Sequence, residues 1–488
     1  MVLSVDLRAI EQSLPTGMRC IVPVAHDKDT LLLPQQLSDF ASMLTSQDFT
    51  GKEGQQYIFN DGKTYLVFVG IGEQGKLLPR HVQRPLGNAV RAHLHKGSEL
   101  AVLAAHIATG DAYTSYLTEL VLSSVLATYS FTKYKSKKNE AKEQTKQILL
   151  FLEKPTKEYT ATVARALEIA KSIAWTRDIV NEPSNATPPQ YLAYLLKSDE
   201  KNAPFHVEIF DGKKIQEMGM QLVWAVGKGS SEDPHFAKVT YMGNPANKKF
   251  VALVGKGVNF DTGGVQVKPD TYMNTMKGDM GGAALVMGVM HALARLGAEV
   301  NVIAYLPFVE NSVDGGAFKP DDVYTAFNGK TVEIKHTDAE GRLILADALA
   351  YASLEKPTEI LDFATLTGAV TVALGPKYAA VMGTNQEAME KLHMLGEEVG
   401  EHVWQLPLED DYRKFMNSDI ADIANVSEKR VAGTIMGGIF LKEFVDASIP
   451  WVHMDIAGVA TTSKGDGIHS DFATGYGVRL MVEYLTRK

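Results

Sequence analysis

From about residue 200 to the C-terminus, short apolar segments alternate with helical segments, and this pattern constrains the fold more than any other feature. Continuous apolar runs are typical of strands that are buried on both faces. Strands that alternate with helices predict a mainly parallel sheet with helices on both sides, and ligands of such sheets bind at the carboxyl ends of the strands. The predicted strands are 205–210, 250–258, 301–309, 331–338, 359–368, 378–383 and 451–458, and the predicted helices are 281–297, 341–356, 432–445 and 473–485.

The first third of the chain has a similar but less regular pattern. Apolar runs at 18–25, 65–72, 99–105 and 147–152 predict the strands of another α/β sheet. A helical pattern then leads into NEPSNATPPQ, whose prolines and asparagines end a helix and begin a loop. We therefore predict a two-domain α/β protein. The smaller N-terminal α/β domain (1–165) would serve assembly or regulation, and the catalytic domain (166–488) would contain a central, mainly parallel mixed sheet flanked by helices.

Composition excludes several classes of function. The chain has 49 Lys and Arg against 58 Asp and Glu, a formal net charge of −9, which disfavours nucleic acid as the main partner. Acidic residues interrupt the basic run Lys133–Lys146, and we interpret it as a solvated loop or hairpin tip. Cys20 is the only cysteine, which excludes a cysteine-based zinc or iron–sulfur site within one chain. The N-terminus does not read as a secretory signal, and no apolar stretch is long enough to span a bilayer, so we expect a cytoplasmic protein without membrane contact.

Two Gly-rich segments place charges where predicted strands and helices meet. VGKGVNFDTGGVQVKP carries Lys256, Asp261 and Lys268 directly after an apolar strand. It matches neither G-x-G-x-x-G nor the P-loop pattern, so a nucleotide-binding loop is weakly supported and a turn-rich loop is the alternative. MKGDMGG places Asp279 just before a helix, where a carboxylate more often caps the helix N-terminus than binds a metal.

The segment IKHTDAEGRLILADAL is the most informative. If the chain stays extended up to Gly341, side chains alternate, and Asp338, Glu340 and Arg342 project to one face. Such a group on the surface is an ion pair worth under about 1 kcal/mol, but the apolar elements on both sides argue against exposure. His336 would point the same way as Asp338, and we favour a neutral hydrogen-bonding role for it over a metal ligand.

We expect the strand ends to bring together four carboxylates, those of Asp261, Asp279, Asp338 and Glu340. Like charges about 4 Å apart repel by about 4 kcal/mol per pair at an effective dielectric of 20, so the cluster needs cations or protons. Two divalent ions would neutralise all four charges, and an oxygen-rich site suits Mg, Mn or Zn. The residues alone leave open whether Lys256 is a structural cation or a deprotonated ligand. No HExxH segment is present, which argues against a single zinc of the thermolysin type.

These segments resemble the leucyl aminopeptidase (cytosol aminopeptidase) family of dinuclear metallopeptidases. HTDAEGRLILADAL, together with VGKGVNFDTGG and MKGDMGGAA, is the most specific part of the resemblance. RDIVNEPSNATPP, ATLTGA, AGTIMGGIFLKEF and ATGYGVRL extend it over the region from residue 170 to the C-terminus. His336 stands where Asn is usual and Asn259 where Thr is more typical. Neither change removes a residue that the family uses for metal binding or catalysis, so we expect an active enzyme.

The resemblance implies an aminopeptidase that releases N-terminal residues from short peptides by means of a water activated between two metal ions. The implied ions are Zn or Mn, with Mg and Co as further candidates. In the family, Asp261 and Glu340 would bridge the two ions and Asp338 would contribute its backbone carbonyl. A lysine ligand must be neutral, so its pKa has to be depressed by the adjacent ions. The implied metal ligands are Lys256, Asp261, Asp279, Asp338 and Glu340.

Further roles follow from the same resemblance. Lys268 and Arg342 match the family's two catalytic basic residues, and a bicarbonate is expected at Arg342. The family's pocket for the first side chain would favour Leu or Met as the N-terminal residue of the substrate. The residues of this chain that match the pocket are a Met and mostly small residues, and in apolar strands such residues are more often ordinary core. Family members assemble as homohexamers, and we expect the same of this chain. The matching pocket residues are Met276, Thr365, Leu366, Gly368, Ala457 and Ala460.

Two alternative functions remain at this level. Another dinuclear hydrolase, such as a phosphoesterase, would use the same ligands, and amide and phosphate ester substrates would separate the two activities. A DNA-binding role, which some bacterial relatives combine with peptidase activity, would appear as a salt-dependent shift of duplex DNA.

Overall fold

The computed structural model describes residues 4–10, 17–94, 98–104, 112–136, 145–201, 203–429 and 431–487. The chain forms two compact units, Met1–Ala174 with Ser463–Phe472 and Trp175–Thr462 with Ala473–Lys488. The sequence border between them falls in helix α4 (Lys157–Asn181), as does the border predicted after residue 165. Residue 105 of a predicted strand and residues 137–144 of the basic run lie outside the described residues.

The first unit is built on a mixed sheet that contains all four strands predicted for this part of the chain. Its strand order is β1-β7-β6-β2-β5-β4, with β3 paired to β2. The β4–β5 and β2–β3 pairs are antiparallel, and the other described pairs are parallel. The strands are β1 (Ser4–Ala9), β2 (Arg19–Asp27), β3 (Thr30–Leu32), β4 (Gln56–Asn60), β5 (Tyr65–Glu73), β6 (Glu99–Leu103) and β7 (Gln147–Leu152), and the helices are α1 (Phe40–Ser46), α2 (Gln83–His93) and α3 (Ala112–Leu126).

A segment from near the C-terminus, 463–472, belongs to this first unit and packs against α2. Asn88 Nδ2 donates to Asp466 Oδ1 at 2.8 Å, and Arg91 donates to the Gly467 carbonyl at 3.0 Å. The backbones approach so closely that a Cβ on Gly87 would lie 2.6 Å from the carbonyl carbon of Gly467. The first unit is therefore made of two stretches that are far apart in the sequence.

The second unit contains a larger sheet with the order β17-β16-β19-β15-β10-β12-β9-β8, and β11 pairs with β12. The central strands β12, β10, β15 and β19 are parallel, whereas β8, β9 and β16 add antiparallel pairs. The predicted mainly parallel mixed sheet is confirmed. The strands are β8 (Phe205–Phe210), β9 (His235–Met242), β10 (Val251–Gly255), β11 (Gly257–Asp261), β12 (Asn301–Asn311), β15 (Ile360–Ala364), β16 (Ala379–Gly383), β17 (Val403–Gln405) and β19 (Trp451–Asp455).

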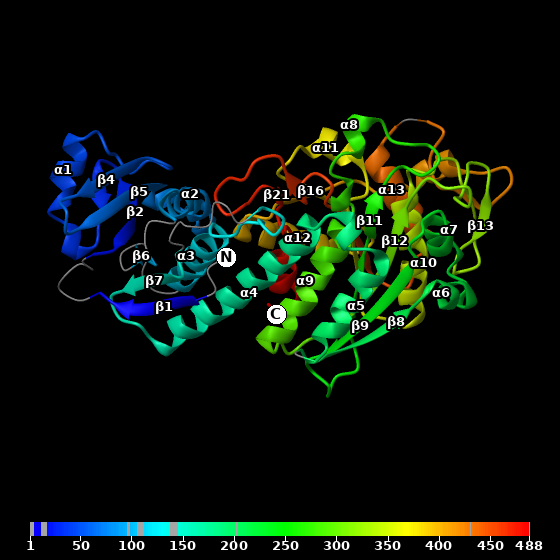
Figure 1. The fold of residues 1–488 in the computed structure, drawn as a ribbon, viewed down its shortest axis with the longest axis horizontal. Coiled ribbons are helices and arrows are strands. Elements are labelled where there is room, and N and C mark those ends of the chain that lie inside the picture. The colour runs from blue at the N-terminus through cyan, green and yellow to red at the C-terminus, as the bar shows by residue number, and fades with distance from the viewer. Residues whose placement is uncertain are drawn as a thin grey trace. The chain divides into compact units, whose positions relative to one another are not determined.

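Helices α9 (Gly281–Leu296) and α10 (Glu340–Leu354) both pack on the central strands β10, β12 and β15, and Figure 1 shows β12 between them. The α10 side is the large core, where side chains such as Val254, Tyr305 and Leu345 pack together. No helix in the described part of the chain has the length and apolar character of a membrane span. The remaining helices of this unit are α5 (Pro189–Asp199), α6 (Gly212–Met218), α7 (Gln221–Gly227), α8 (Asp270–Met273), α11 (Gly368–Leu374), α12 (Gln386–Val399), α13 (Gly433–Lys442) and α14 (Val478–Thr486).

The predicted strand 250–258 is two strands, β10 and β11, which are separated at Lys256. The N-terminus of α9 packs there: the Lys256 carbonyl accepts from the Ala283 N–H at 2.8 Å instead of joining the sheet. A Cβ on Gly255 would lie 2.7 Å from Ala283 Cα, so this close approach requires glycine. The break changes the direction of the chain at Lys256, which is the first of the predicted metal ligands.

Two further predictions were wrong in their bounds. The predicted strand 331–338 ends at Glu333 in β14 (Thr331–Glu333), which pairs with β13 (Val323–Thr325) and β18 (Ile423–Ala424). Beyond it, the N–H groups of Lys335 and His336 donate to the Asn425 side chain rather than to a neighbouring strand. The helix predicted from residue 473 begins at Val478, because Gly475 and Gly477 have positive φ angles of 69° and 87° that a helix interior does not accept.

Candidate metal centre

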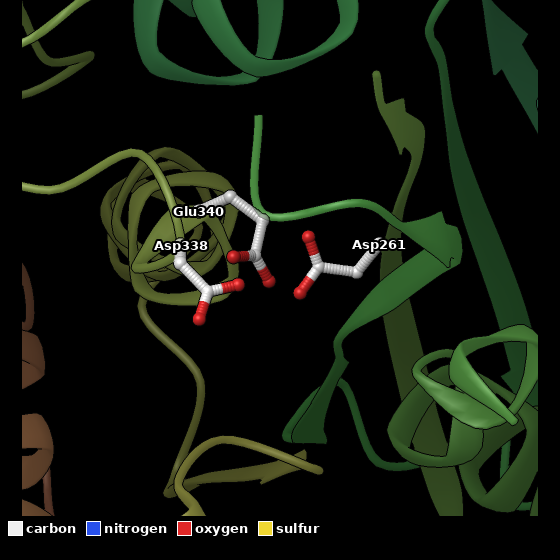
Figure 2. A group of neighbouring side chains, drawn as sticks. All are labelled: Asp261, Asp338 and Glu340. Carbon is white, nitrogen blue, oxygen red and sulfur yellow. The ribbon is translucent and has the colours of Figure 1, made fainter. Parts of the chain in front are cut away.

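Three carboxylates from two segments of the chain meet in the second unit (Figure 2). Asp261 ends β11, Asp338 lies in the loop after β14, and Glu340 is the first residue of α10. One oxygen of each lies within 4.8 Å of those of the other two. Asp261 and Glu340 are buried and Asp338 is half-buried. Negative charges this close together and removed from water require a cation or bound protons.

Asp338 and Glu340 come together for a different reason from the predicted one. The chain is not extended over residues 334–340, because β14 ends at Glu333 and α10 begins at Glu340. A turn that leads into the helix brings the two carboxylates together, so the predicted strand alternation is wrong. Arg342 lies in the first turn of α10, and its Nη1 donates to the Asn425 carbonyl at 2.9 Å.

Asp279 does not cap α9, so the helix cap that its segment suggested when taken alone is wrong. Its Oδ1 accepts from Lys256 Nζ at 2.7 Å and from Thr365 Oγ1 at 2.8 Å. Its Oδ2 is buried, and no donor within the described ranges reaches it. Lys256 Nζ also lies 3.0 Å from Glu340 Oε1 and donates to the Thr365 carbonyl at 2.9 Å. A buried oxygen without a donor has a lone pair available for a cation.

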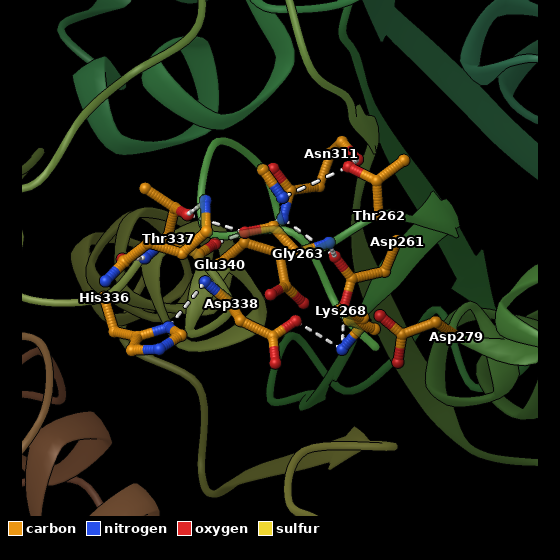
Figure 3. Close-up of polar contacts among 12 residues, drawn as sticks. Asp261, Thr262, Gly263, Lys268, Asp279, Asn311, His336, Thr337, Asp338 and Glu340 are labelled. Atoms are coloured by element: carbon orange, nitrogen blue, oxygen red, sulfur yellow. Dashed lines mark hydrogen bonds and ion pairs between the residues drawn. The ribbon is translucent and has the colours of Figure 1, made fainter. Parts of the chain in front are cut away.

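Lys268 contacts the cluster at Asp261 and Asp338 (Figure 3). Its Nζ is 2.7 Å from Asp261 Oδ2 and forms an ion pair with Asp338 Oδ1. Lys256 and Lys268 supply two ammonium groups against four carboxylates. Two negative charges remain when all six side chains are ionised. The donor set of carboxylate oxygens and one amine therefore fits divalent cations.

Burial and the neighbouring charges together set the pKa values of the groups in this cluster. Burial, with the nearby Glu340 carboxylate, raises the pKa of Asp261 to about 7, although both lysines oppose this. Burial also raises the pKa of Asp279 well above its usual range. For Lys256, burial lowers the pKa, but the surrounding carboxylates outweigh it and raise the pKa above its ordinary value. Divalent ions would reverse both directions, because they favour ionised carboxylates and a neutral amine.

Asn311, which is not among the predicted site residues, orients Asp261. It ends β12, and its Nδ2 donates to Asp261 Oδ1 at 2.8 Å and to the Thr337 carbonyl at 3.1 Å. The Gly263 N–H donates to the same Asp261 oxygen at 2.8 Å. Gly263 has a φ of 88°, and a Cβ there would lie 2.9 Å from the backbone nitrogen of Lys268, so only glycine fits. The position of Asn311 just beyond the carboxyl end of the predicted strand 301–309 is the signal that could have identified it.

Asn425 holds the loop that carries Asp338. Its Oδ1 accepts from the N–H groups of Lys335 and His336, and its Nδ2 donates to the His336 carbonyl at 2.7 Å. His336 Nδ1 accepts from the Asp338 N–H at 3.1 Å, in agreement with the hydrogen-bonding role predicted for it. No feature of the sequence indicated Asn425, because its partners lie about 90 residues away.

A cavity of about 360 Å³ lies beside the cluster. Lys256, Lys268, Asp279 and Asp338 form part of its wall. Ala460, predicted as a pocket residue, is buried and does not belong to the described lining. Several threonines and Tyr272 line the cavity without having been predicted. The predicted pocket residues that line it are Met276, Thr365, Leu366, Gly368 and Ala457.

Comparison with known protein families identifies the family of the chain that contains this site. Residues 174–482 match the catalytic domain of the cytosol aminopeptidase family, and residues 30–138 match the N-terminal domain of the same family. The chain belongs to the cytosol aminopeptidase family. As a member of it, the protein is a metal-dependent aminopeptidase, and the clustered Asp261, Asp338 and Glu340 lie in its catalytic domain.

Other cytosol aminopeptidases are similar over nearly their whole length. The probable cytosol aminopeptidase of Geobacter sp. (strain M21) is 39% identical over 448 residues, which cover 91% of this chain and 90% of that protein. That of Persephonella marina (strain DSM 14350 / EX-H1) is 37% identical over 490 residues, 96% of each chain. Among solved structures, the bottromycin maturation enzyme BotP in complex with Mn is similar with a TM-score of 0.85 and 31% identity, covering 96% of this chain and 98% of that one.

Proposed function

We propose that the chain is a dinuclear leucyl-type aminopeptidase that hydrolyses the first peptide bond of short peptides. The observation that carries the proposal is the group of four carboxylates and two lysines beside the cavity, with the buried Asp279 Oδ2 reached by no donor among the described residues. One ion would be held by Lys256, Asp261 and Asp279, and the other by Asp261, Asp338 and Glu340. The native ions would be Zn or Mn, with Mg and Co as further candidates, and the Mn of the BotP complex supports Mn.

When bound, the two ions would supply the Lewis acidity that polarises the peptide carbonyl and lowers the pKa of the attacking water. Lys268 lines the cavity and has a side chain that is 14% exposed, so its ammonium group can reach a substrate. We assign to it a hydrogen bond to the peptide oxygen, which strengthens as negative charge develops there.

Arg342 would hold a bicarbonate. Its guanidinium is buried, and burial lowers its pKa to about 10. Nη1 binds the Asn425 carbonyl, whereas Nε finds no acceptor in the part of the chain that the structure describes. A buried donor of this kind suits an anion. The role of Arg342 would be to orient that anion for proton transfer to the leaving amine.

The cavity supports a preference for Leu or Met at the N-terminus of the substrate. Met276 and Leu366 supply apolar surface, and the small residues Gly368 and Ala457 leave room between them. Each methylene that fits such a pocket changes the transition-state free energy by about 1–3 kcal/mol. We further propose, from the family's common assembly, a homohexamer that works in the cytoplasm. The mass of the particle in light scattering tests the assembly.

Leucine amide hydrolysis, combined with metal analysis by mass spectrometry before and after chelation, tests the central proposal. We expect two divalent ions per chain, loss of activity when they are removed, and recovery when Mn²⁺ or Zn²⁺ is returned. A metal-free sample that hydrolyses leucine amide at the original rate would contradict the two-metal site. Hydrolysis of a phosphate ester with no hydrolysis of the amide would favour the phosphoesterase alternative.

A further inference from the structure

One buried carboxylate outside the metal cluster holds two segments of the cavity wall at once. Asp455 is the last residue of β19 and is fully buried. Its Oδ1 accepts from the N–H groups of Leu366 and Ala457, both at 3.1 Å, and its Oδ2 accepts from Thr367 Oγ1 at 2.7 Å. All three donor residues line the cavity. Asp455 itself is not one of the described residues that line the cavity.

The opposite side of the same wall is tied to the metal ligands. The Thr365 carbonyl accepts from Lys256 Nζ at 2.9 Å, and Thr365 Oγ1 donates to Asp279 Oδ1 at 2.8 Å. Thr365 is followed directly by Leu366 and Thr367. Three consecutive residues therefore connect two candidate metal ligands to Asp455.

The strand that carries Asp455, β19, is held firmly in the sheet. In the sheet, Asp455 is the register partner of Ala364 in β15 and of Ala380 in β16, so strands flank it on both sides. Two residues earlier on β19, His453 Nδ1 lies 2.6 Å from Asp362 Oδ1, and Trp451 Nε1 donates to Asp362 Oδ2 at 2.7 Å. This buried polar network fixes the end of β19, because each of its bonds is shielded from water.

We propose that Asp455 is a positioning residue that sets the distance between the side-chain pocket and the metal centre, and thereby the preference for large over small N-terminal residues. This inference rests on the proposed aminopeptidase function. A substrate with a large side chain contacts the Leu366–Gly368 wall, whereas an N-terminal alanine is too short to depend on it. Each fitted methylene contributes roughly 10- to 200-fold to discrimination, so a loosened wall lowers selectivity before it lowers catalysis.

The test compares kcat/KM for leucine amide and alanine amide in three variants. Thr367→Val keeps the approximate shape but removes the hydroxyl, which donates to Asp455 and also accepts from the Val370 N–H at 3.3 Å as the N-terminal cap of α11. Thr367→Ser restores both contacts. Asp455→Asn replaces one of the two accepting oxygens by an NH₂ group that can only donate. Asp422→Asn is the matched control, because Asp422 also accepts from a threonine, Thr331, through both the N–H and the hydroxyl, but does so at the surface and outside the cavity lining.

We expect the leucine-to-alanine ratio of kcat/KM to fall at least tenfold in Thr367→Val and Asp455→Asn, mainly through KM for leucine amide. It should remain near the wild-type value in Thr367→Ser and Asp422→Asn, and metal content should stay the same in all of them. An unchanged ratio in Thr367→Val, or an equal loss on both amides, would overturn the role of Asp455. If Asp455→Asn does not fold, the threonine pair decides. A wild-type enzyme that hydrolyses neither amide would instead refute the proposed function.

Discussion

A methyl group placed at Gly341 would disturb the proposed metal centre without removing any ligand. Gly341 is the second residue of α10, and a Cβ built on it lies 2.4 Å from Lys256 Cε and 2.7 Å from Lys256 Nζ. Non-bonded carbon atoms rest about 3.5–4.0 Å apart, so Lys256 would have to move by about 1 Å. Lys256 is buried and bound to Asp279, Glu340 and Thr365, and the movement would break these contacts.

The expected cost falls on the chemistry rather than on the fold. Alanine stabilises a helix relative to glycine by about 1 kcal/mol, which offsets part of the strain. A displacement of about 1 Å in an active site costs on the order of 100-fold, which corresponds to about 2.7 kcal/mol of transition-state stabilisation. We therefore predict that Gly341→Ala folds normally, binds fewer than two ions per chain and loses about 100-fold in kcat/KM.

The assay is leucine amide hydrolysis at saturating Mn²⁺, with metal content and thermal unfolding measured on the same samples. Gly315→Ala is the matched control, because a Cβ at Gly315 meets no atom within 4 Å. A folded Gly341→Ala variant with kcat/KM within twofold of the wild type would refute the assignment of Lys256 to the metal centre.

Three further perturbations test other parts of the site and the core. Glu340→Ala should lose bound metal and turnover while circular dichroism stays native, and full metal occupancy would contradict its role as a bridging ligand. Lys268→Ala should keep the metal but lose roughly 10²–10³ in kcat, as expected for one oxyanion donor, and an unchanged kcat would exclude that role. Burial raises the pKa of Asp347 to about 7. The Asp347 carboxyl loses its proton at a lower pH in the unfolded chain than in the folded chain. The free energy of unfolding should therefore fall by up to about 4 kcal/mol as the pH rises from about 4 to about 7. Urea unfolding at pH 5 and pH 8 should show a flatter dependence in Asp347→Asn, and parallel pH profiles would contradict the reasoning.

The strands were predictable because a strand that is buried on both faces has a continuous run of apolar residues in the sequence. β7 and β8 have the predicted bounds to the residue, since apolar runs bounded by polar residues allow few alternatives. Asp261 and Lys268 were identifiable for a related reason, since they follow an apolar strand and the carboxyl ends of parallel strands share one edge.

The failures share a cause, which is that tertiary partners override local patterns. Asp279 has the sequence context of a helix cap, but Lys256 and Thr365 bind it instead. Asp347, in the middle of α10, accepts from the N–H groups of Leu222 and Val223 at the start of α7. Partners 86 to 125 residues away leave no trace in a local window of sequence.

The packing of 463–472 against α2 has a practical consequence for anyone who divides the gene. An expression plasmid that stops after codon 174 would omit the partners of Asn88 and Arg91, and one that starts there would produce Asp466 and Gly467 without theirs. Neither product would be a complete folding unit, although the family's two domains match separate stretches of the sequence, 30–138 and 174–482. Dissection of this enzyme therefore calls for replacing 463–472 with a short linker and supplying the ten-residue stretch to the other fragment.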